Sequence, residues 1–294
     1  PVREQYRVEE RFARYKTLNE VLAAERDEPL QQFFFVPWQW NYLAQHRHET
    51  NAPRSWLATL YRWYWYLTID LGLHIALSSL VRVFRAHGAK SFFKAVVPLT
   101  VIRGWRVVDK SHHMLIMEHE LFRHIEIELF VRRSRLARAL ELARDLIVAC
   151  DDSGATLSPD APPAFRAAGV LDELTGGGQR YTHHYPICVR RVIPDETLLS
   201  MTSSDGRPDE DYYALSFISY ARPDRRAGFQ RFARLLYSCL THHCDARPHW
   251  GKVAPLTRKD VDRLYPQAER FRELRRAADP HGRFLNEWTE SLFG

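Results

Sequence analysis

The sequence predicts an α+β fold, with a mixed or antiparallel sheet covered by helices on one side. Three observations lead to this prediction. Apolar and polar residues alternate at period two over 125–131, which is typical of a strand. Apolar residues recur at helical spacing over 136–147. Along the chain, strand-like segments come first, helical ones follow, and the two then alternate.

The N-terminal segments are expected to be short strands and one short helix. Residues 1–15 and the apolar run 31–37, which ends at Pro37, are predicted strands. A helix is expected to begin at Thr17 and to stop before Pro29. Residues 41–54 are polar and are interpreted as a strand edge followed by a loop.

Residues 56–85 are unusually aromatic, in a chain that holds 8 Trp, 13 Tyr and 16 Phe. A membrane-spanning helix needs about 20 consecutive apolar residues. Arg62, Asp70 and His74 interrupt this segment, so a span is not expected. The segment is instead expected to form one or two helices. These are either buried in protein, which is favoured, or lie in a membrane interface. Residues 91–103 continue the segment, with Pro98 as a helix breaker.

The second half of the chain is expected to alternate strands and helices. The period-two pattern begins at Met114, and Ser134 is the expected N-cap of the helix that follows. Asp, Gly and Pro make 151–178 a predicted loop. The further predictions are strands at 185–193 and 211–220, a helix at 225–243, a helix cap at Thr257 and Asp260, and a helix after Pro266.

The composition excludes several function classes. The net charge of +6 is mild, and the basic run Arg132-Arg133-x-Arg135 is short, so no nucleic-acid partner is expected. Four cysteines in 294 residues do not make a disulfide framework, and none forms a CxxC pair. The histidine doublets lack HxxxH or HExxH spacing, so no metal site is expected.

Two short segments hold candidate functional residues. Cys188 and Arg190 lie two apart on a predicted strand, so their side chains share a face. The guanidinium could orient a substrate oxygen, or it could be a surface group on an edge strand. The segment RPHWGKV (247–253) offers Lys252, which could stabilise developing negative charge. Alternatively this segment is a loop whose Trp250 packs on the core.

Four blocks of the C-terminal half resemble the sugar-1,4-lactone oxidases, the family of L-gulono-1,4-lactone and D-arabinono-1,4-lactone oxidases. They are HYPICVRRVIPDETLLS (184–200), RPHWGKVAPLTRKDVDRLYP (247–266), FRELRRAADPHGRFLN (271–286) and ESLF (290–293). The resemblance implies a flavoprotein of the vanillyl-alcohol-oxidase type that binds FAD. It further implies oxidation of a hydroxyl-bearing carbon of a sugar lactone or related small molecule, by hydride transfer to flavin N5.

The resemblance also implies a domain organisation. Residues 1–15 would end an FAD-binding domain, 16–265 would form the cap or substrate domain with an aromatic helical insertion at about 56–103, and 266–294 would return to the FAD-binding domain. The FAD-binding N-terminal half is not visible in this sequence and would lie in the same or a separate chain. Pro1 is accordingly interpreted as an interior boundary.

Site residues follow from the same resemblance. It places Arg190, Lys252, Cys188 and Ser216 on the substrate side, as catalytic residues, and His249, Trp250, Lys252 and Asn286 near the flavin. One position departs from the family. Cys188-Val189-Arg190 stands where the family commonly has Glu-x-Arg, which removes a hydroxyl-orienting carboxylate. A shifted, less polar substrate is therefore expected.

A second function class stays open, a non-catalytic module that retains the cap fold and binds a membrane or a partner. The aromatic helices favour it, whereas the intact RPHWGK and FLN motifs favour the enzyme. Both a cytoplasmic and a peripherally membrane-associated location are compatible with the sequence.

Overall fold

The computed structural model describes residues 5–73, 75, 79, 90–91, 101–102, 104–116, 124–151, 156–219 and 226–294. Most of the predicted helical segment beyond residue 73, including 92–100, lies outside these ranges, as do residues 117–123. The chain forms two compact units. The first unit comprises Pro1–Ile125, Arg180–Arg190 and Phe217–Phe229, and the second comprises Glu126–Gln179, Arg191–Ser216 and Gln230–Gly294.

Antiparallel strands form the base of the first unit, in the order β4-β1-β3-β2-β6. Their bounds are β1 Arg7–Tyr15, β2 Gln32–Val36, β3 Asn41–Thr50, β4 Val107–Lys110 and β6 Ile187–Val192. The strand predictions for 1–15, 31–37 and 185–193 are thus confirmed. The expectation of an edge at 41–54 is wrong, because β3 pairs with β1 on one side and with β2 on the other.

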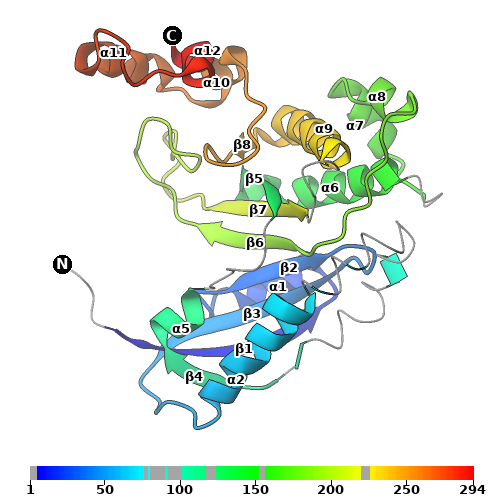
Figure 1. Cartoon of the computed structure of the whole chain (residues 1–294), viewed down its shortest axis with the longest axis vertical. Coiled ribbons are helices and arrows are strands. Elements are labelled where there is room, and N and C mark those ends of the chain that lie inside the picture. The colour runs from blue at the N-terminus through cyan, green and yellow to red at the C-terminus, as the bar shows by residue number, and fades with distance from the viewer. Residues whose placement is uncertain are drawn as a thin grey trace. The chain divides into compact units, whose positions relative to one another are not determined.

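Helices α2 (Ala58–Trp65) and α5 (Ser111–Leu115) pack on this sheet (Figure 1). Tyr61 of α2 and Met114 of α5 join Val8 and Val107 in one buried cluster. The predicted strand start at Met114 is wrong, because Met114 belongs to the short helix α5 and its side chain is buried in this core. The predicted helix at Thr17 is confirmed as α1 (Leu18–Ala24). Thr17 and Glu20 form a capping box at its N-terminus.

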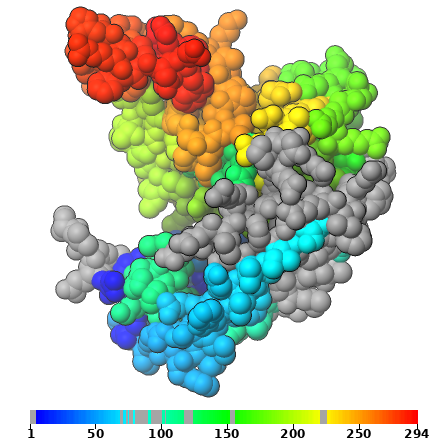
Figure 2. Space-filling model, in the orientation of Figure 1, coloured from blue at the N-terminus to red at the C-terminus, as the bar shows by residue number. Residues whose placement is uncertain are grey.

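The aromatic segment is helical as predicted, since α2 continues into the π-helix η1 (Tyr66–Leu73). Its burial is only partial. Tyr61 is 4% exposed, whereas Trp56 is 87% and Trp63 is 57% exposed. Figure 2 shows this segment on the visible face. Among the described residues, no helix has the length and apolar character that a bilayer crossing requires.

The second unit contains the strand order β7-β5-β8, with β5 Ile125–Arg132, β7 Tyr212–Ser219 and β8 Arg247–Pro248. Two long helices accompany it, α6 (Leu136–Asp151) and α9 (Ala227–Cys244), both of which the sequence predicts. The strands β5 and β7 are confirmed as well. Together the two units make the α+β fold with antiparallel strand pairing that the sequence predicts.

Two local predictions in this unit are wrong. Ser134 does not cap α6, because a 3-10 turn (Arg133–Arg135) precedes the helix and the Ser134 hydroxyl donates to Glu210. The predicted loop 151–178 contains two short helices, α7 (Ala161–Ala167) and α8 (Leu171–Thr175). Pro at the start of α7 suits a first helical turn, where no backbone N–H donor is needed.

Three helices end the chain, α10 (Arg258–Leu264), α11 (Ala268–Ala278) and α12 (Glu287–Phe293). The predicted cap is confirmed, because Thr257 and Asp260 form a capping box at α10. Arg272 of α11 is buried and joins the three helices. Its guanidinium donates to Asp262 Oδ1 at 2.5 Å and to the Leu292 carbonyl at 3.2 Å.

Two adjacent histidines are buried in the first unit. Burial lowers the pKa of His183 to about 3 and also lowers the pKa of His184. The Trp38 indole donates to the His183 carbonyl at 2.8 Å, and the Tyr181 hydroxyl lies 3.1 Å from His183 Nδ1. The folded state therefore holds both imidazoles neutral.

This burial predicts a stability loss in acid. An unfolded histidine binds a proton near pH 6.5, whereas folded His183 does so only near pH 3. The unfolded state thus binds more protons between these values, and each extra proton lowers the free energy of unfolding by about 1.4 kcal/mol per pH unit. We expect the urea midpoint to be level above pH 7 and to fall below pH 6.5.

The variant His183→Gln should have a lower midpoint at pH 7 but a shallower decline from pH 6.5 to 4.5. Exposed His281 provides the matched control, since His281→Gln should keep the native slope. Equal slopes in all three proteins would show that His183 is not the titrating group.

Candidate functional site

A lysine held between two carboxylates is the central feature of the second unit. Glu126 and Glu128 lie two apart on β5, so both side chains leave the same face. The Lys252 ammonium is 2.8 Å from Glu126 Oε1 and 2.7 Å from Glu128 Oε2. The side chain of Glu128 is only 3% exposed, whereas those of Glu126 and Lys252 are 11% and 23% exposed.

Ser216 completes this cluster from β7. Its hydroxyl donates to Glu128 Oε1 at 3.0 Å, so both oxygens of the buried carboxylate accept a hydrogen bond. Ionised carboxylates in protein interiors require such partners. The structure thereby joins two of the residues proposed from the resemblance, Lys252 and Ser216, through a glutamate that connects them.

The lysine loop is attached to β5 by its backbone. Pro248 and Arg247 pair with Leu129 and Phe130. Beyond this bridge, the His249 N–H donates to the Glu128 carbonyl at 2.9 Å and the Val253 N–H to the Glu126 carbonyl at 3.0 Å. The loop therefore follows the strand, and this register brings Lys252 to the two carboxylates.

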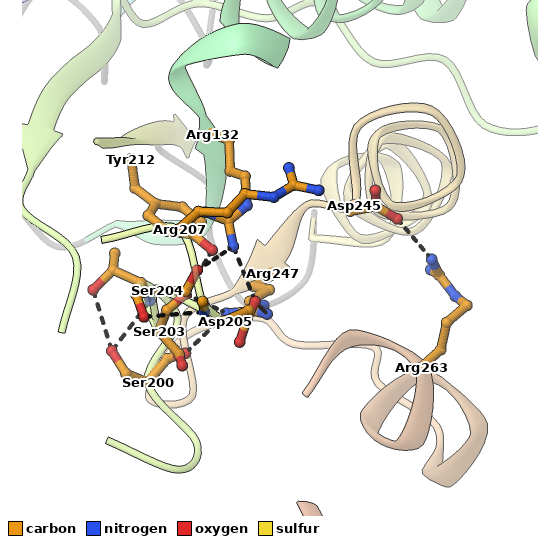
Figure 3. A network of polar contacts seen from close by, with 12 residues as sticks. Arg132, Ser200, Ser203, Ser204, Asp205, Arg207, Tyr212, Asp245, Arg247 and Arg263 are labelled. Carbon is orange, nitrogen blue, oxygen red and sulfur yellow. Dashed lines mark hydrogen bonds and ion pairs between the residues drawn. The ribbon is translucent and has the colours of Figure 1, made fainter. Parts of the chain in front are cut away.

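Arg247 fixes the start of the loop. It is 4% exposed, and its guanidinium contacts Asp205 and the carbonyls of Ser200 and Ser203 (Figure 3). It also lies over the Tyr265 ring at 4.9 Å. Arg132 of β5 reaches the same Asp205 carboxylate at 3.1 Å. Both arginines hold strands of the site against the loop 195–211.

Three expected flavin-edge residues have other contacts here. The Trp250 indole donates to the Leu199 carbonyl at 2.8 Å and packs on Tyr265 and Phe293. Asn286 caps α12 by accepting from the Thr289 N–H at 2.9 Å. His249 Nδ1 accepts the Gly251 N–H at 3.0 Å, which places the proton of a neutral ring on Nε2.

Cys188 and Arg190 belong to the first unit and form a group of their own. Both lie on β6, where Arg190 is exposed and directly opposite Gln32 of β2. The Cys188 thiol lies 3.8 Å from Gln32 Oε1. Cys188 is half-buried, whereas Cys150, Cys239 and Cys244 are buried.

No sequence pattern or family resemblance predicts a role for Glu126, Glu128, Arg247 or Gln32. For the glutamates a signal existed, namely two carboxylates at alternate positions of a strand whose other residues up to Val131 are apolar. Within the described ranges, no three His, Cys, Asp or Glu side chains are grouped as a metal ion would require.

Comparison with known proteins gives a consistent family. The family model for D-arabinono-1,4-lactone oxidase matches residues 3–292. A long-chain alcohol oxidase of an uncultured marine euryarchaeote is 47% identical over 291 residues, which cover 99% of this chain and 60% of that protein. The L-gulonolactone oxidase of Bos taurus is 34% identical over 123 residues, which cover 42% of this chain and 27% of that protein.

The fold is similar to that of solved oxidases. A cholesterol oxidase from B. sterolicum superposes with a TM-score of 0.62 at 12% sequence identity, over 99% of this chain and 60% of that one. A solvent-stable cholesterol oxidase gives a TM-score of 0.54 over 84% of this chain. Nearly the whole of this chain matches the alcohol oxidase, but it spans only about 60% of that protein's length.

The cluster predicts a specific response to loss of its cation. Lys252→Met leaves two carboxylates side by side without a counter-charge, and breaking such a buried pair costs on the order of 3 kcal/mol. We expect a lower free energy of unfolding at pH 7. The deficit should shrink toward pH 4.5, since protonation of the carboxylates removes their repulsion.

Urea unfolding of the variant at pH 7 and pH 4.5 measures both effects. Lys259→Met, at an exposed lysine of α10, is the matched control and should change little at either pH. A deficit of the same size at both pH values would contradict the ionic account of the cluster.

Proposed function

Because the chain belongs to the D-arabinono-1,4-lactone oxidase family, we propose that it forms the substrate side of an FAD-dependent oxidoreductase acting on a hydroxyl-bearing carbon. The family binds FAD. The observation that carries the proposal is the buried carboxylate Glu128, which Lys252 and Ser216 hold from two different segments. The FAD-binding N-terminal half, in the same or a separate chain, would be the partner of this part.

The donor set around Lys252 fits a flavin edge or a substrate oxygen. An ammonium has three N–H donors, and Glu126 and Glu128 accept two of them. The third can be directed to an oxygen atom, since the lysine side chain is 23% exposed. When bound, FAD supplies the acceptor for the hydride that leaves the substrate carbon.

Glu126 is the residue that we assign to accept the hydroxyl proton. Oxidation of an alcohol releases a hydride from carbon and a proton from oxygen, and the proton needs a base. The Glu126 side chain is more exposed than that of Glu128, at 11% against 3%. Glu128 instead keeps Lys252 and Ser216 in place, since both of its oxygens are engaged.

The roles of the remaining predicted residues are also proposals, and they rest on the family resemblance. Arg190 and Cys188 would face the substrate from β6, with the guanidinium orienting a hydroxyl or carbonyl oxygen. His249 would contact the flavin. For Trp250 and Asn286 the structure supports an indirect role, because their polar groups hold the lysine loop and the start of α12.

The substrate that we propose is an alcohol on a largely apolar molecule, before a sugar lactone. A relative that matches 99% of this chain is named for long-chain alcohols. In addition, Cys188 stands where the family resemblance implies a carboxylate. A long-chain alcohol offers one hydroxyl group, so it needs fewer polar partners than a lactone does.

A non-catalytic module is the less favoured candidate. Burying Glu128 costs solvation free energy, and a module without chemistry could replace the ion cluster by apolar residues at no loss of stability. The exposed residues Trp56 and Trp63 would serve such a module as a contact surface. The ion cluster therefore supports the enzyme.

The test uses the complete flavin-loaded protein with a long-chain primary alcohol and with L-gulono- and D-arabinono-1,4-lactone. We expect turnover of the alcohol to exceed that of the lactones. Glu126→Gln should lower kcat by about 10²–10⁴-fold, the usual effect of a lost base. Lys252→Met and Arg190→Ala should also lower turnover.

Glu141→Gln is the matched control, because the Glu141 side chain is 65% exposed on α6 and pairs only at the surface with Arg138. It should keep the native rate. Native turnover in Glu126→Gln would reject the assigned base. A flavin-loaded protein that oxidises none of these compounds would reject the proposed function.

A further inference from the structure

A row of polar side chains crosses the sheet of the first unit, buried at Glu10, Arg47 and Gln45 and more exposed toward β6. Glu10 of β1 lies opposite Arg47 of β3, and Gln45 of β3 lies opposite Gln32 of β2. Gln32 in turn lies opposite Arg190 of β6. Paired residues, and residues two apart on a strand, share a face. The row therefore runs on one face of the sheet, from β1 to the edge of the proposed substrate site.

Glu10 anchors the row as a hydrogen-bond acceptor. Glu10 Oε2 lies 2.6 Å from Arg47 Nε and 2.7 Å from Gln45 Nε2. The Tyr61 hydroxyl of α2 donates to Oε1. Burial and the nearby Glu10 raise the pKa of Tyr61, which keeps this hydroxyl a donor. Glu10 is 2% exposed, so its carboxylate depends on these donors.

The carboxylate sets the direction of both amides. A carboxylate accepts and cannot donate, so Gln45 must turn its NH₂ group to Glu10 and its oxygen to Gln32. Gln32 must then turn its own NH₂ group to Gln45, to which it donates. This leaves Gln32 Oε1 on the side of β6. A reversal of either amide would place like groups against each other.

The free side of Gln32 Oε1 lies beside the two residues proposed to face the substrate. The Cys188 thiol is 3.8 Å from this oxygen, and Arg190 is directly across the strand pair. A carbonyl oxygen has two lone pairs and can accept two hydrogen bonds. Gln32 thus presents a fixed acceptor beside Cys188, the position at which the family resemblance implies a carboxylate.

We propose that Gln32 is a specificity-determining residue, which accepts a hydrogen bond from the substrate hydroxyl, and that Glu10 and Gln45 are positioning residues that fix its direction. This inference rests on the proposed function, because it places the substrate at β6. An amide oxygen orients the hydroxyl of the bound alcohol but is too weak a base to remove its proton. A hydroxyl has one proton, so its O–H bond must turn away from Gln32 before the base accepts that proton. Gln32 therefore suits a neutral alcohol and leaves proton transfer to another group.

The direction of the Gln32 amide can be tested without turnover, through the thiol of Cys188. Burial raises the pKa of Cys150 and Cys239 to about 12 and that of Cys244 to about 11, so Cys188 should react first with N-ethylmaleimide. Gln45→Met removes the amide that directs Gln32, yet keeps Glu10 with Arg47 and Tyr61. Gln32 can then turn its NH₂ group toward the sulfur and stabilise the thiolate.

We expect alkylation of the 294-residue chain at pH 7 to be up to about tenfold faster in Gln45→Met, which corresponds to one pKa unit of the thiol. Gln31→Met is the matched control, because Gln31 is also buried but donates to the Val21 carbonyl outside the row. Gln31→Met should keep the native alkylation rate. A native alkylation rate in Gln45→Met would overturn the proposal that Gln45 fixes the direction of the Gln32 amide.

Kinetics of the flavin-loaded protein test the specificity role. Gln32→Met and Gln45→Met should each raise KM for a long-chain primary alcohol by roughly tenfold, the effect of about one lost hydrogen bond, with a smaller change in kcat. Native KM values in both variants would reject this inference alone. Absence of alcohol oxidation in the native protein would reject the proposed function, while the alkylation result would still report the amide direction.

Discussion

A lysine ammonium between two carboxylates, one of them buried, is the interaction on which the site in the second unit depends. The Glu128 carboxylate is buried and therefore needs hydrogen-bond donors in place of water. Lys252 and Ser216 supply these donors from distant parts of the chain. The loop hydrogen bonds along β5 and the burial of Arg247 follow from this requirement, because they hold Lys252 at the one register that serves both carboxylates. Stability and the proposed chemistry therefore rest on the same contacts.

The first unit also contains a buried carboxylate that accepts hydrogen bonds from several side chains. There, Glu10 is buried among Arg47, Gln45 and Tyr61, and the acceptor character of its carboxylate extends through two amides to β6. In both units a buried carboxylate fixes the direction of the hydrogen bonds that neighbouring side chains make.

Local sequence patterns predicted the strands β1, β2, β5, β6 and β7 and the helices α1, α6 and α9, because each pattern depends on neighbours along the chain. They could not place β3 inside the sheet, since its second partner β1 is set by long-range pairing. The resemblance indicates Lys252 and Ser216, whereas the local pattern shows Glu126 and Glu128 only as the polar positions of an alternating strand. Their partner Lys252 is 124 residues from Glu128, a separation that no periodicity reveals.

The most direct test of the central interaction is ¹⁵N NMR of the lysine side chains in the 294-residue chain, with Lys252→Arg to assign the signal. The ion cluster predicts one ammonium resonance of Lys252 that exchanges slowly with water and becomes fast in Glu128→Gln. A Lys252 ammonium that exchanges as fast as that of the exposed Lys259 would contradict the account.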